Sequence, residues 1–282
     1  MTKKKLLILT GPTAIGKSDA AVEYALKTGC DVISADSMQV YRGLDIGTGK
    51  ITKQEMRGVK HHMIDVAEPD EDYSVGKYVY EAEKIIDLQK FPPIICGGTG
   101  LYITSLVLGS DFGGVGKDEA IRNKWKNILA DKGKQYIYEF LEKIDPESAE
   151  KISVNDTKRV IRAIEIYEMT GSPKSKLVSE NNTKYDAKTV ILYDDDRDAL
   201  YKRINTRVDK MFASGLIDEV ESLMKYENCG SMQAIGYKET IEFLKGKISK
   251  EEAIEKVKQN SRNYAKRQIT YFKGMRIVDN NM

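Results

Sequence analysis

The chain begins with an apolar run that leads directly into a glycine-rich loop. Leu6–Leu9 reads as a short buried strand, and residues 19–27 have a helical pattern. Between them lies a complete G-x-x-x-x-G-K-[ST] sequence, formed by Gly11, Pro12, Thr13, Ala14, Ile15, Gly16, Lys17 and Ser18. In this strand–loop–helix context, backbone N–H groups can surround a polyphosphate, and the start of the helix adds a favourable dipole. The feature therefore predicts a phosphate site at one edge of an α/β sheet.

Two side chains of this loop have predicted roles of their own. Lys17 would supply a positive charge to the phosphates, and the Ser18 hydroxyl would be a ligand of Mg²⁺, the one cofactor that we expect. The loop alone does not say which phosphates it holds, or whether they are transferred, hydrolysed or released.

The composition bounds the class of protein. The chain has 282 residues, of which 41% are hydrophobic and 31% charged, as in ordinary globular proteins of one or two domains. A net charge of +2 is too small to imply nucleic-acid binding by itself, so any basic surface must be local. Cys30, Cys96 and Cys229 lie far apart and form no C-x-x-C pair, which argues against a zinc site or a disulfide framework and for a reducing compartment.

The first residues superficially resemble a signal peptide. Lys3–Lys5 precedes the apolar stretch Leu6–Leu9, but that stretch is too short and continues into the phosphate loop. No run approaches the roughly 18 apolar residues that a membrane span needs. We therefore expect a cytoplasmic protein without a membrane partner.

Strand-like and helical patterns alternate through the first hundred residues. Apolar runs at Leu6–Leu9, Asp31–Ser34 and Pro93–Cys96 predict strands, and Asp19–Lys27 and Val75–Leu88 predict helices. This alternation is typical of a parallel sheet wrapped by helices. The fold class we predict is α/β, with a P-loop parallel sheet core flanked by helices and an all-helical insertion domain.

The insertion is predicted from a break followed by a purely helical stretch. The break is marked by the glycines Gly109, Gly113, Gly114 and Gly116. The helices expected after it are Glu119–Lys132, Gln135–Lys143, Pro146–Ile152 and Asp156–Thr170. Strand character returns at Thr189–Leu192, and the chain closes with a long helical pattern, Lys250–Phe272. We predict a core of residues 1–115 and 186–282, and an insertion of residues 116–185.

Polar side chains follow the second and third predicted strands. Asp36 comes after Asp31–Ser34, and the glycine-rich turn that contains Thr99 follows Pro93–Cys96. Ligands gather beyond the carboxyl ends of parallel strands, so both turns should lie near the phosphate loop. Asp36 can bind Mg²⁺, accept a proton or cap a turn, and Thr99 can belong to a simple close-packed turn; the residues alone leave these alternatives open. The absence of an acidic residue at the end of Pro93–Cys96 weakens the case for a standard ATPase.

Basic residues form one pair of interest, and histidines form another. Arg203 and Arg207 share a face of a predicted helix and can clamp a phosphate, although salt bridges to Asp198 or Asp209 are the simpler explanation. The adjacent His61-His62 would point to opposite faces of an extended segment, so we predict a structural role rather than a shared metal site.

The last predicted helix has the most skewed charge. Between residues 256 and 276 there is no acid, and the basic residues are Lys256, Lys258, Arg262, Lys266, Arg267, Lys273 and Arg276. Tyr264, Tyr271 and Phe272 are interleaved with them. Basic and aromatic residues together suit nucleic-acid binding, while a solvated face with aromatics turned into the core is the alternative.

Taken in order, these segments resemble the tRNA dimethylallyltransferases of the bacterial type, also called tRNA isopentenyltransferases. The matching segments extend over nearly the whole chain: Gly11–Ser18, Asp36–Thr48, His61–Val66, Gly97–Tyr102, Asn155-Asp156, Arg159–Ala163, Ala234–Glu239 and Tyr264–Thr270. A phosphate loop is shared by many unrelated enzymes, whereas this ordered set is specific.

The resemblance implies transfer of a dimethylallyl group from dimethylallyl diphosphate to N6 of the adenosine directly 3′ of the anticodon in tRNA, with release of diphosphate. Asp36 is then similar to the general base that takes the N6 proton from a flipped base, and Thr99 to a hydroxyl near the reacting groups. The phosphate loop, Mg²⁺ and either Arg203 or Arg207 would hold the diphosphate.

The resemblance also implies contacts with the anticodon stem-loop. The residues that it assigns to tRNA are Asp36, Ser37, Met38, Gln39, Thr99, Arg122, Lys158, Arg159, Val160, Ile161, Arg162, Gln233, Ala234, Ile235, Gly236, Tyr237, Lys238, Lys266, Arg267, Gln268 and Lys273. Gly49 stands where the family more often has alanine, a difference that we expect to be harmless. The sequence after Lys273 is short and shows no zinc-binding extension, and we expect a monomer.

Three other functions remain in competition. A phosphate-loop kinase of a nucleoside or small molecule explains Gly11–Ser18 but leaves the basic helix unassigned. A related isopentenyltransferase acting on free AMP or ADP would not need the segments that contact tRNA. A non-enzymatic RNA-binding module would keep its function without Asp36.

Overall fold

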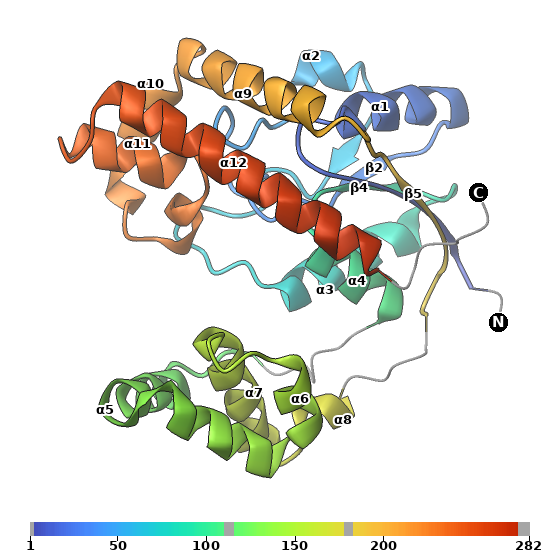
Figure 1. The fold of residues 1–282 in the computed structure, drawn as a ribbon. Coiled ribbons are helices and arrows are strands. Elements are labelled where there is room, and N and C mark those ends of the chain that lie inside the picture. The colour runs from blue at the N-terminus through green and yellow to red at the C-terminus, as the bar shows by residue number, and fades with distance from the viewer. Residues whose placement is uncertain (1–2, 110–115, 178–182, 276–282) are drawn as a thin grey trace. The chain divides into compact units, whose positions relative to one another are not determined.

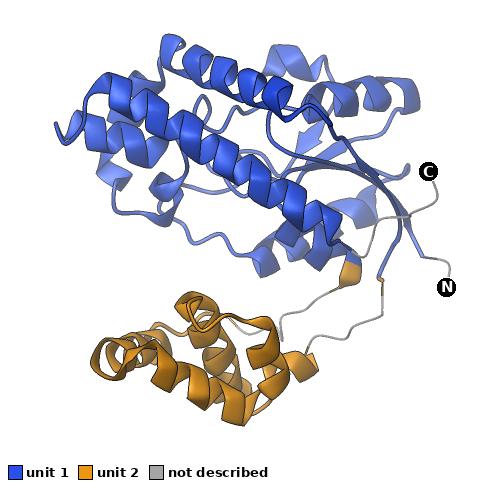
Figure 2. Ribbon diagram, viewed as in Figure 1, with its two compact units in different colours: residues 1–107, 184–282 blue, residues 108–183 orange. Residues whose placement is uncertain are grey.

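The computed structural model describes residues 3–109, 116–177 and 183–275. The chain divides into two compact units (Figure 2): unit 1 comprises residues 1–107 and 184–282, and unit 2 comprises residues 108–183. The predicted insertion, residues 116–185, lies almost entirely within unit 2. Two glycines of the predicted break, Gly113 and Gly114, and Arg276 of the basic run lie outside the described residues.

Unit 1 is built on a parallel sheet, as predicted. Among the described residues five strands pair in the order β3-β2-β4-β1-β5 (Figure 1), and every pairing is parallel. Their bounds are β1 Lys5–Thr10, β2 Val32–Ser34, β3 His61–His62, β4 Ile94–Gly97 and β5 Asp186–Ile191. The strand β3 was not predicted, because a two-residue strand of histidines has no apolar run. His62 lies 2.7 Å from the Asp31 carboxylate, in line with a structural role.

Helices cover both faces of this sheet and extend beyond its edge. Those of unit 1 are α1 Lys17–Thr28, α2 Lys53–Met56, α3 Val75–Leu88, α4 Gly100–Leu108, α9 Arg197–Ala213, α10 Leu216–Ser222, α11 Tyr237–Leu244 and α12 Lys250–Lys273. Two short 3₁₀ turns, Met224–Tyr226 and Gly230–Gln233, connect α10 to α11.

The core explains why the strand sequences are continuously apolar. Alternate residues of β1 point to opposite faces, where Ile8 packs with side chains of α3 and α4 while Leu9 packs with α1. A strand buried on both faces must be apolar throughout. On the α3 side the end of α12 joins the same core through the buried Phe272. This position agrees with the alternative in which aromatics of the basic helix turn inward.

The helices α9 and α12 also pack against the phosphate loop. Leu200 and Ile204 of α9 form a cluster with Ala265 of α12, and Ala14 and Ile15 of the loop lie against it. The C-terminal helix therefore helps to build the phosphate site instead of standing apart from it.

Unit 2 consists of helices in its described part. They are α5 Glu119–Ile144, α6 Pro146–Lys151, α7 Thr157–Thr170 and α8 Lys174–Leu177. The predicted interruption between residues 132 and 135 is present, because Gly133 in the middle of α5 has non-helical angles, φ 80° and ψ 172°. The core of this unit contains Trp125, Leu141 and Val160.

A buried carboxylate joins two of these helices. Glu165 of α7 is 0% exposed. Its Oε1 accepts hydrogen bonds from the Asp118 N–H at 2.7 Å and the Arg122 Nε–H at 2.9 Å, and its Oε2 accepts one from Arg162 Nη1 at 2.7 Å. Arg122 and Arg162, both predicted tRNA contacts, are thus oriented by one acidic side chain.

We expect Glu165→Gln to lower the free energy of unfolding of unit 2 by about 2–3 kcal/mol, because the partly buried Arg122 and Arg162 lose the charge of their fully buried partner. Trp125 is the only tryptophan of the chain and lies in this core, so its fluorescence during urea titration reports on unit 2. The matched control is Glu142→Gln at an exposed position of α5. Equal midpoints for the two variants would contradict the role given to Glu165.

Candidate active site

Two glycine-rich turns are tied together by one amide side chain. Gln268 of α12 accepts a hydrogen bond from the Thr13 N–H and donates one to the Gly98 carbonyl, each at 2.9 Å. The side chain is only 5% exposed. Gln268 therefore holds the phosphate loop against the turn that follows β4, and the prediction that it contacts tRNA is corrected: it is a buried structural link.

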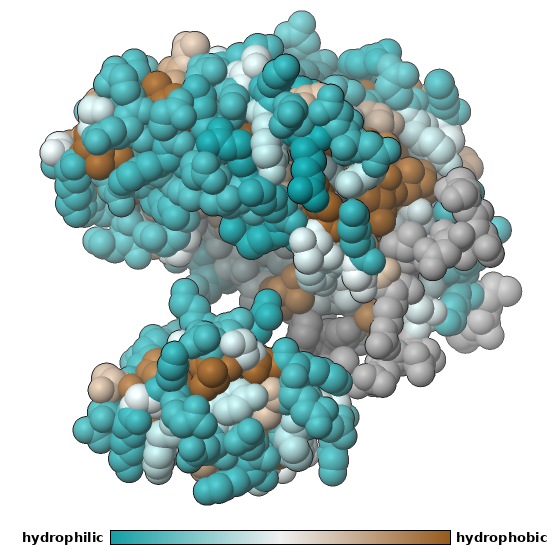
Figure 3. Space-filling model, viewed as in Figure 1, coloured by the Kyte–Doolittle hydropathy of each residue, from teal (hydrophilic) through white to brown (hydrophobic). Residues whose placement is uncertain are grey.

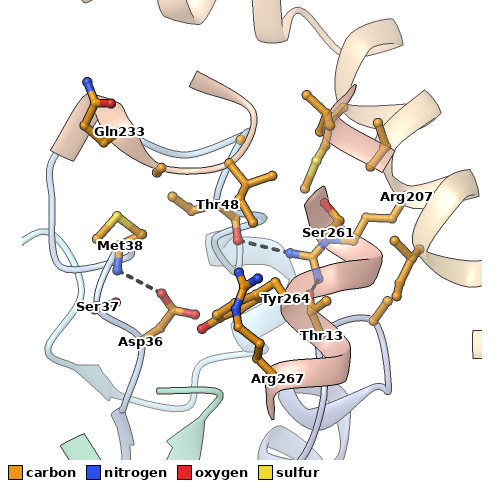
Figure 4. Close-up of a pocket in the computed structure, with 18 of the residues that line it drawn as sticks. Thr13, Asp36, Ser37, Met38, Thr48, Arg207, Gln233, Ser261, Tyr264 and Arg267 are labelled. Atoms are coloured by element: carbon orange, nitrogen blue, oxygen red, sulfur yellow. Dashed lines mark hydrogen bonds between the residues drawn. The ribbon is translucent and has the colours of Figure 1, made fainter. Parts of the chain in front are cut away.

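The turn after β2 places Asp36 at the same edge of the sheet. Asp36 Oδ1 accepts hydrogen bonds from the N–H groups of Met38 at 2.9 Å and Gln39 at 3.3 Å. Thr99 supports this turn from behind, since its Oγ1 accepts the Ser37 N–H at 2.9 Å. Asp36 thus does cap its turn, one of the three roles left open, while its carboxylate still borders open space (Figure 4).

Two adjoining cavities meet at Asp36. The first, of about 450 Å³, we call the apolar cavity, because its walls include Ile204, Val208, Met211, Ile235 and Val257. The second, of about 380 Å³, we call the loop cavity, because Gly16, Lys17 and Ser18 line it. The side chains that line both are Thr13, Ala14, Asp36, Thr48, Arg207 and Tyr264.

Lys17 lies in the loop cavity in a partly desolvated position. Its Nζ donates a hydrogen bond to the Pro12 carbonyl at 2.7 Å. The pKa of Lys17 is lowered to about 8, mainly by burial; Cys96 and Asp36 oppose this shift, and the positive charge of Arg207 adds to it. An anion bound beside this amine would raise its pKa again, because it favours the charged form.

The structure separates the two arginines of α9. Arg207 lines both cavities, and its guanidinium donates to Thr13 Oγ1 at 3.2 Å and to the Thr48 carbonyl at 3.0 Å. Arg203 pairs with Asp194 at 2.6 Å and lines neither cavity. The salt bridges proposed as the simpler explanation are thus replaced by other partners. Arg203 Nε also donates to the Ala14 carbonyl of the phosphate loop at 3.3 Å, and which of the two arginines holds the diphosphate stays a prediction that Arg207 fits better.

Thr99 and Tyr264 are in contact at the rear of the site. The pKa of Tyr264 is raised to about 12, mainly by burial and also by the charge of Asp36, while hydrogen bonding with Thr99 and Gln268 opposes the shift. Thr99 itself lines neither cavity. A direct catalytic role for Thr99 stays a prediction; its geometry is that of a residue that positions Ser37 and Tyr264.

The structure shows what lies beside the glycine at position 49. Gly49 has φ 58°, in the left-handed region, and a Cβ there would lie 1.8 Å from Arg207 Nη2. An alanine would require the guanidinium, the far end of a flexible side chain, to shift, so the harmlessness of the difference from the family stays a prediction. No local pattern indicates this contact, because the two residues lie far apart in the chain.

Several predicted tRNA contacts are corrected by their burial. Val160, Ile161 and Tyr237 have side chains that are 0%, 7% and 0% exposed and belong to hydrophobic cores. They cannot reach RNA in this arrangement.

Other predicted tRNA contacts line the apolar cavity or are exposed on the surface. The predicted residues that line the apolar cavity are Asp36, Ser37, Met38, Gln233, Ala234, Ile235 and Arg267. Lys266 and Lys273 are exposed on α12, over the rings of Tyr201 and Tyr193 respectively. The face formed by α9 and α12 is largely hydrophilic (Figure 3). In unit 2, Lys158 and Arg159 are exposed.

Among the described residues, no group of three or more histidine, cysteine, aspartate or glutamate side chains is arranged to hold a metal ion. No helix in that part of the chain is long and apolar enough to cross a membrane.

Two protein-family models match this chain. A family model described as IPP transferase matches residues 39–275, and one described as isopentenyl transferase matches residues 4–71. The chain belongs to the IPP transferase family. Together the two matches cover both cavities, from the phosphate loop to the end of α12.

Individual proteins that are similar to this chain carry names of the same family. A tRNA dimethylallyltransferase of Thermoanaerobacter sp. is 48% identical, covering 96% of this chain and 89% of its own. The solved structure of a tRNA isopentenylpyrophosphate transferase from Staphylococcus epidermidis is similar with a TM-score of 0.71 at 43% identity, covering 98% of this chain and 92% of that one. A eukaryotic dimethylallyltransferase acting on tRNA reaches a TM-score of 0.82 at 32% identity, covering 95% of this chain and 70% of that one.

Binding of inorganic diphosphate is expected to weaken as the pH rises through about 8, where free Lys17 loses its proton. Below that pH the affinity for diphosphate has its full value, because Lys17 is protonated and attracts the anion. Above it the affinity falls by up to about tenfold per pH unit, because the neutral amine does not attract the anion. Calorimetric dissociation constants on either side of this pH test the expectation. Diphosphate itself titrates, so the pH dependence is read as the difference between wild type and Lys17→Met, with the exposed Lys27→Met as control; identical profiles for all three proteins would contradict it.

Proposed function

We propose that this protein transfers a dimethylallyl group from dimethylallyl diphosphate to N6 of the adenosine directly 3′ of the anticodon in tRNA, and releases diphosphate. The observation that supports it most is the position of Asp36, whose carboxylate borders both the loop cavity and the apolar cavity. One proton acceptor thus stands between a site for phosphates and a site for an apolar group and a base.

The chemistry of the reaction fits these side chains. The exocyclic N6 amine is a poor nucleophile, so its attack on the allylic carbon is assisted by a carboxylate that accepts the proton while the C–N bond forms. The allylic C–O bond breaks and leaves its electron pair on the diphosphate. Backbone amides of the phosphate loop, Lys17 and Arg207 are the groups that would stabilise the growing negative charge.

The apolar cavity suits the remaining parts of the two substrates. Its aliphatic and thioether walls can surround a prenyl chain without unsatisfied polar groups. Tyr264 offers a ring and Arg267 a guanidinium plane beside Asp36 (Figure 4), both suited to stacking on a base. A base extruded from an anticodon loop costs only a few kcal/mol to unstack.

The proposed cofactor is Mg²⁺, with Ser18 as its ligand. Mg²⁺ keeps several waters and binds through one or two protein oxygens together with substrate phosphates. The Ser18 hydroxyl, with Asp36 nearby on the wall of the loop cavity, fits that donor set, and a dedicated cage of acidic side chains is not required. When bound, the ion would neutralise charge on the diphosphate.

The proposed partner is the tRNA anticodon stem-loop, held by exposed basic residues of both units. Lys266 and Lys273 on α12 and Lys158 and Arg159 on α7 are the candidates in the described residues. A tRNA acceptor places the reaction in the cytoplasm, and the protein is expected to act as a monomer.

Asp36→Asn is expected to lower kcat for prenyl transfer by roughly a hundredfold to ten-thousandfold, the usual value of a general base. Asparagine keeps an oxygen for the N–H groups of Met38 and Gln39, so the turn and the affinity for tRNA should be preserved. Asp36→Ala should abolish transfer as well. Normal turnover of Asp36→Asn at saturating tRNA would refute the assignment of Asp36 as the general base.

Neutralising Lys266 and Arg267 together is expected to weaken tRNA binding and to flatten its dependence on salt concentration, because each phosphate contact releases counterions. The matched control replaces Lys247 and Lys250, exposed near the other end of α12, by glutamine. If both double variants keep the salt slope of the wild type, these residues do not face the RNA.

The two rival enzymatic functions differ from the proposed one in the substrate that accepts the transferred group or in the substrate that donates it. Labelled dimethylallyl diphosphate offered with tRNA, AMP and ADP should label tRNA alone, and mass spectrometry of its nucleosides should find the group on adenosine. Labelling of AMP or ADP would indicate the related isopentenyltransferase. Transfer of the γ-phosphate of ATP without prenylated RNA would indicate a kinase.

A further inference from the structure

A short loop forms the wall between the two cavities and is fixed by one carboxylate. This wall loop, Asp45–Lys50, contributes Thr48 to both cavities, Gly47 to the apolar cavity, and Gly49 and Lys50 to the loop cavity. Glu219 of α10 lies behind it and is partly buried.

Within the described part of the chain, three of the four hydrogen bonds that this carboxylate accepts come from the wall loop, and the fourth comes from Tyr237 of α11. Its Oε2 accepts the N–H groups of Asp45 at 3.2 Å and Ile46 at 2.7 Å. Its Oε1 accepts the Gly47 N–H at 3.2 Å and the Tyr237 hydroxyl at 2.5 Å. Three successive backbone donors on one carboxylate define the path of the loop, because hydrogen bonds to a charged acceptor are stronger than neutral ones.

The wall loop, held in place by Glu219, in turn contacts Arg207. The Thr48 carbonyl accepts a hydrogen bond from Arg207 Nη2 at 3.0 Å, and the next residue, Gly49, leaves the space that the guanidinium occupies. The Gly49 carbonyl also accepts Gln39 Nε2, at 3.4 Å, which links the loop to the turn of Asp36. A shift of the loop would therefore move the arginine that borders the phosphates.

We propose that Glu219 is a positioning residue for anion binding: it fixes the wall loop, and the loop with Gly49 holds the Arg207 guanidinium in the diphosphate site. Glu219 touches neither cavity and takes no part in proton transfer. The inference deepens the proposed function by naming what sets the affinity for the diphosphate group. It rests on that function only in the choice of ligand.

The first test is binding of inorganic diphosphate, measured by calorimetry without tRNA or prenyl donor. Glu219→Gln should raise the dissociation constant about tenfold, because in either orientation of the amide its NH₂ group faces backbone N–H donors. The matched control is Glu221→Gln, an exposed residue of the same helix, which should stay within about twofold of wild type. In transfer assays KM for dimethylallyl diphosphate should rise and kcat should fall, because Arg207 also stabilises the charge that grows on the leaving diphosphate, while KM for tRNA remains close to wild type.

Two further variants keep the proposal falsifiable if Glu219→Gln does not fold. Tyr237→Phe removes the hydroxyl that donates to Glu219 Oε1 and should also weaken diphosphate binding, by about threefold, because the carboxylate is held less firmly. In an Arg207→Gln background, neither Glu219→Gln nor Tyr237→Phe should have a further effect, because both act through the same side chain.

The outcomes are distinct. Unchanged diphosphate affinity in Tyr237→Phe or in folded Glu219→Gln would overturn the proposal, as would full additivity with Arg207→Gln. If diphosphate binding behaves as expected but no acceptor is ever prenylated, the positioning role stands and the proposed function fails.

Discussion

The candidate site depends above all on the amide of Gln268, which joins α12 to both glycine-rich turns. Its two hydrogen bonds fix the phosphate loop at Thr13 and the β4 turn at Gly98. Tyr264 lies one helical turn earlier on the same helix and lines both cavities. A C-terminal helix that reads as a basic surface is thus also an internal wall of the site, and its exposed residues can grip a macromolecule while its buried ones shape the pocket.

This arrangement changes what the phosphate loop indicates. In many proteins such a loop serves a nucleotide whose terminal phosphate is transferred or hydrolysed. Here the neighbouring space is apolar, and the carboxylate between them is held by backbone amides where an incoming amine could reach it. The combination suits a substrate with phosphates at one end and a hydrocarbon at the other, and the family to which the chain belongs agrees with it.

The fold and the order of the motifs are largely readable from the sequence, because apolar runs, glycine turns and helix caps are local signals. The parallel sheet, the interruption at Gly133 and the location of Asp36 near the loop follow from such signals, whereas the role of Arg203 or Arg207 comes only from the resemblance to a family. What could not be predicted depends on contacts between distant residues. Arg207 closely approaches Gly49, and Val160, Ile161 and Tyr237 stand in motifs yet are buried. A motif shows which residues belong together, but not which of them face the substrate.

The central claim is that this loop holds a diphosphate that leaves from carbon, not a phosphate that moves between oxygens. A single-turnover reaction with tRNA, dimethylallyl diphosphate and ATP tests it directly, with inorganic diphosphate and prenylated adenosine measured in the same sample. The account predicts that the two products appear in equal amounts and that ATP is untouched. Consumption of ATP to give a phosphorylated product, without prenylated adenosine, would contradict it.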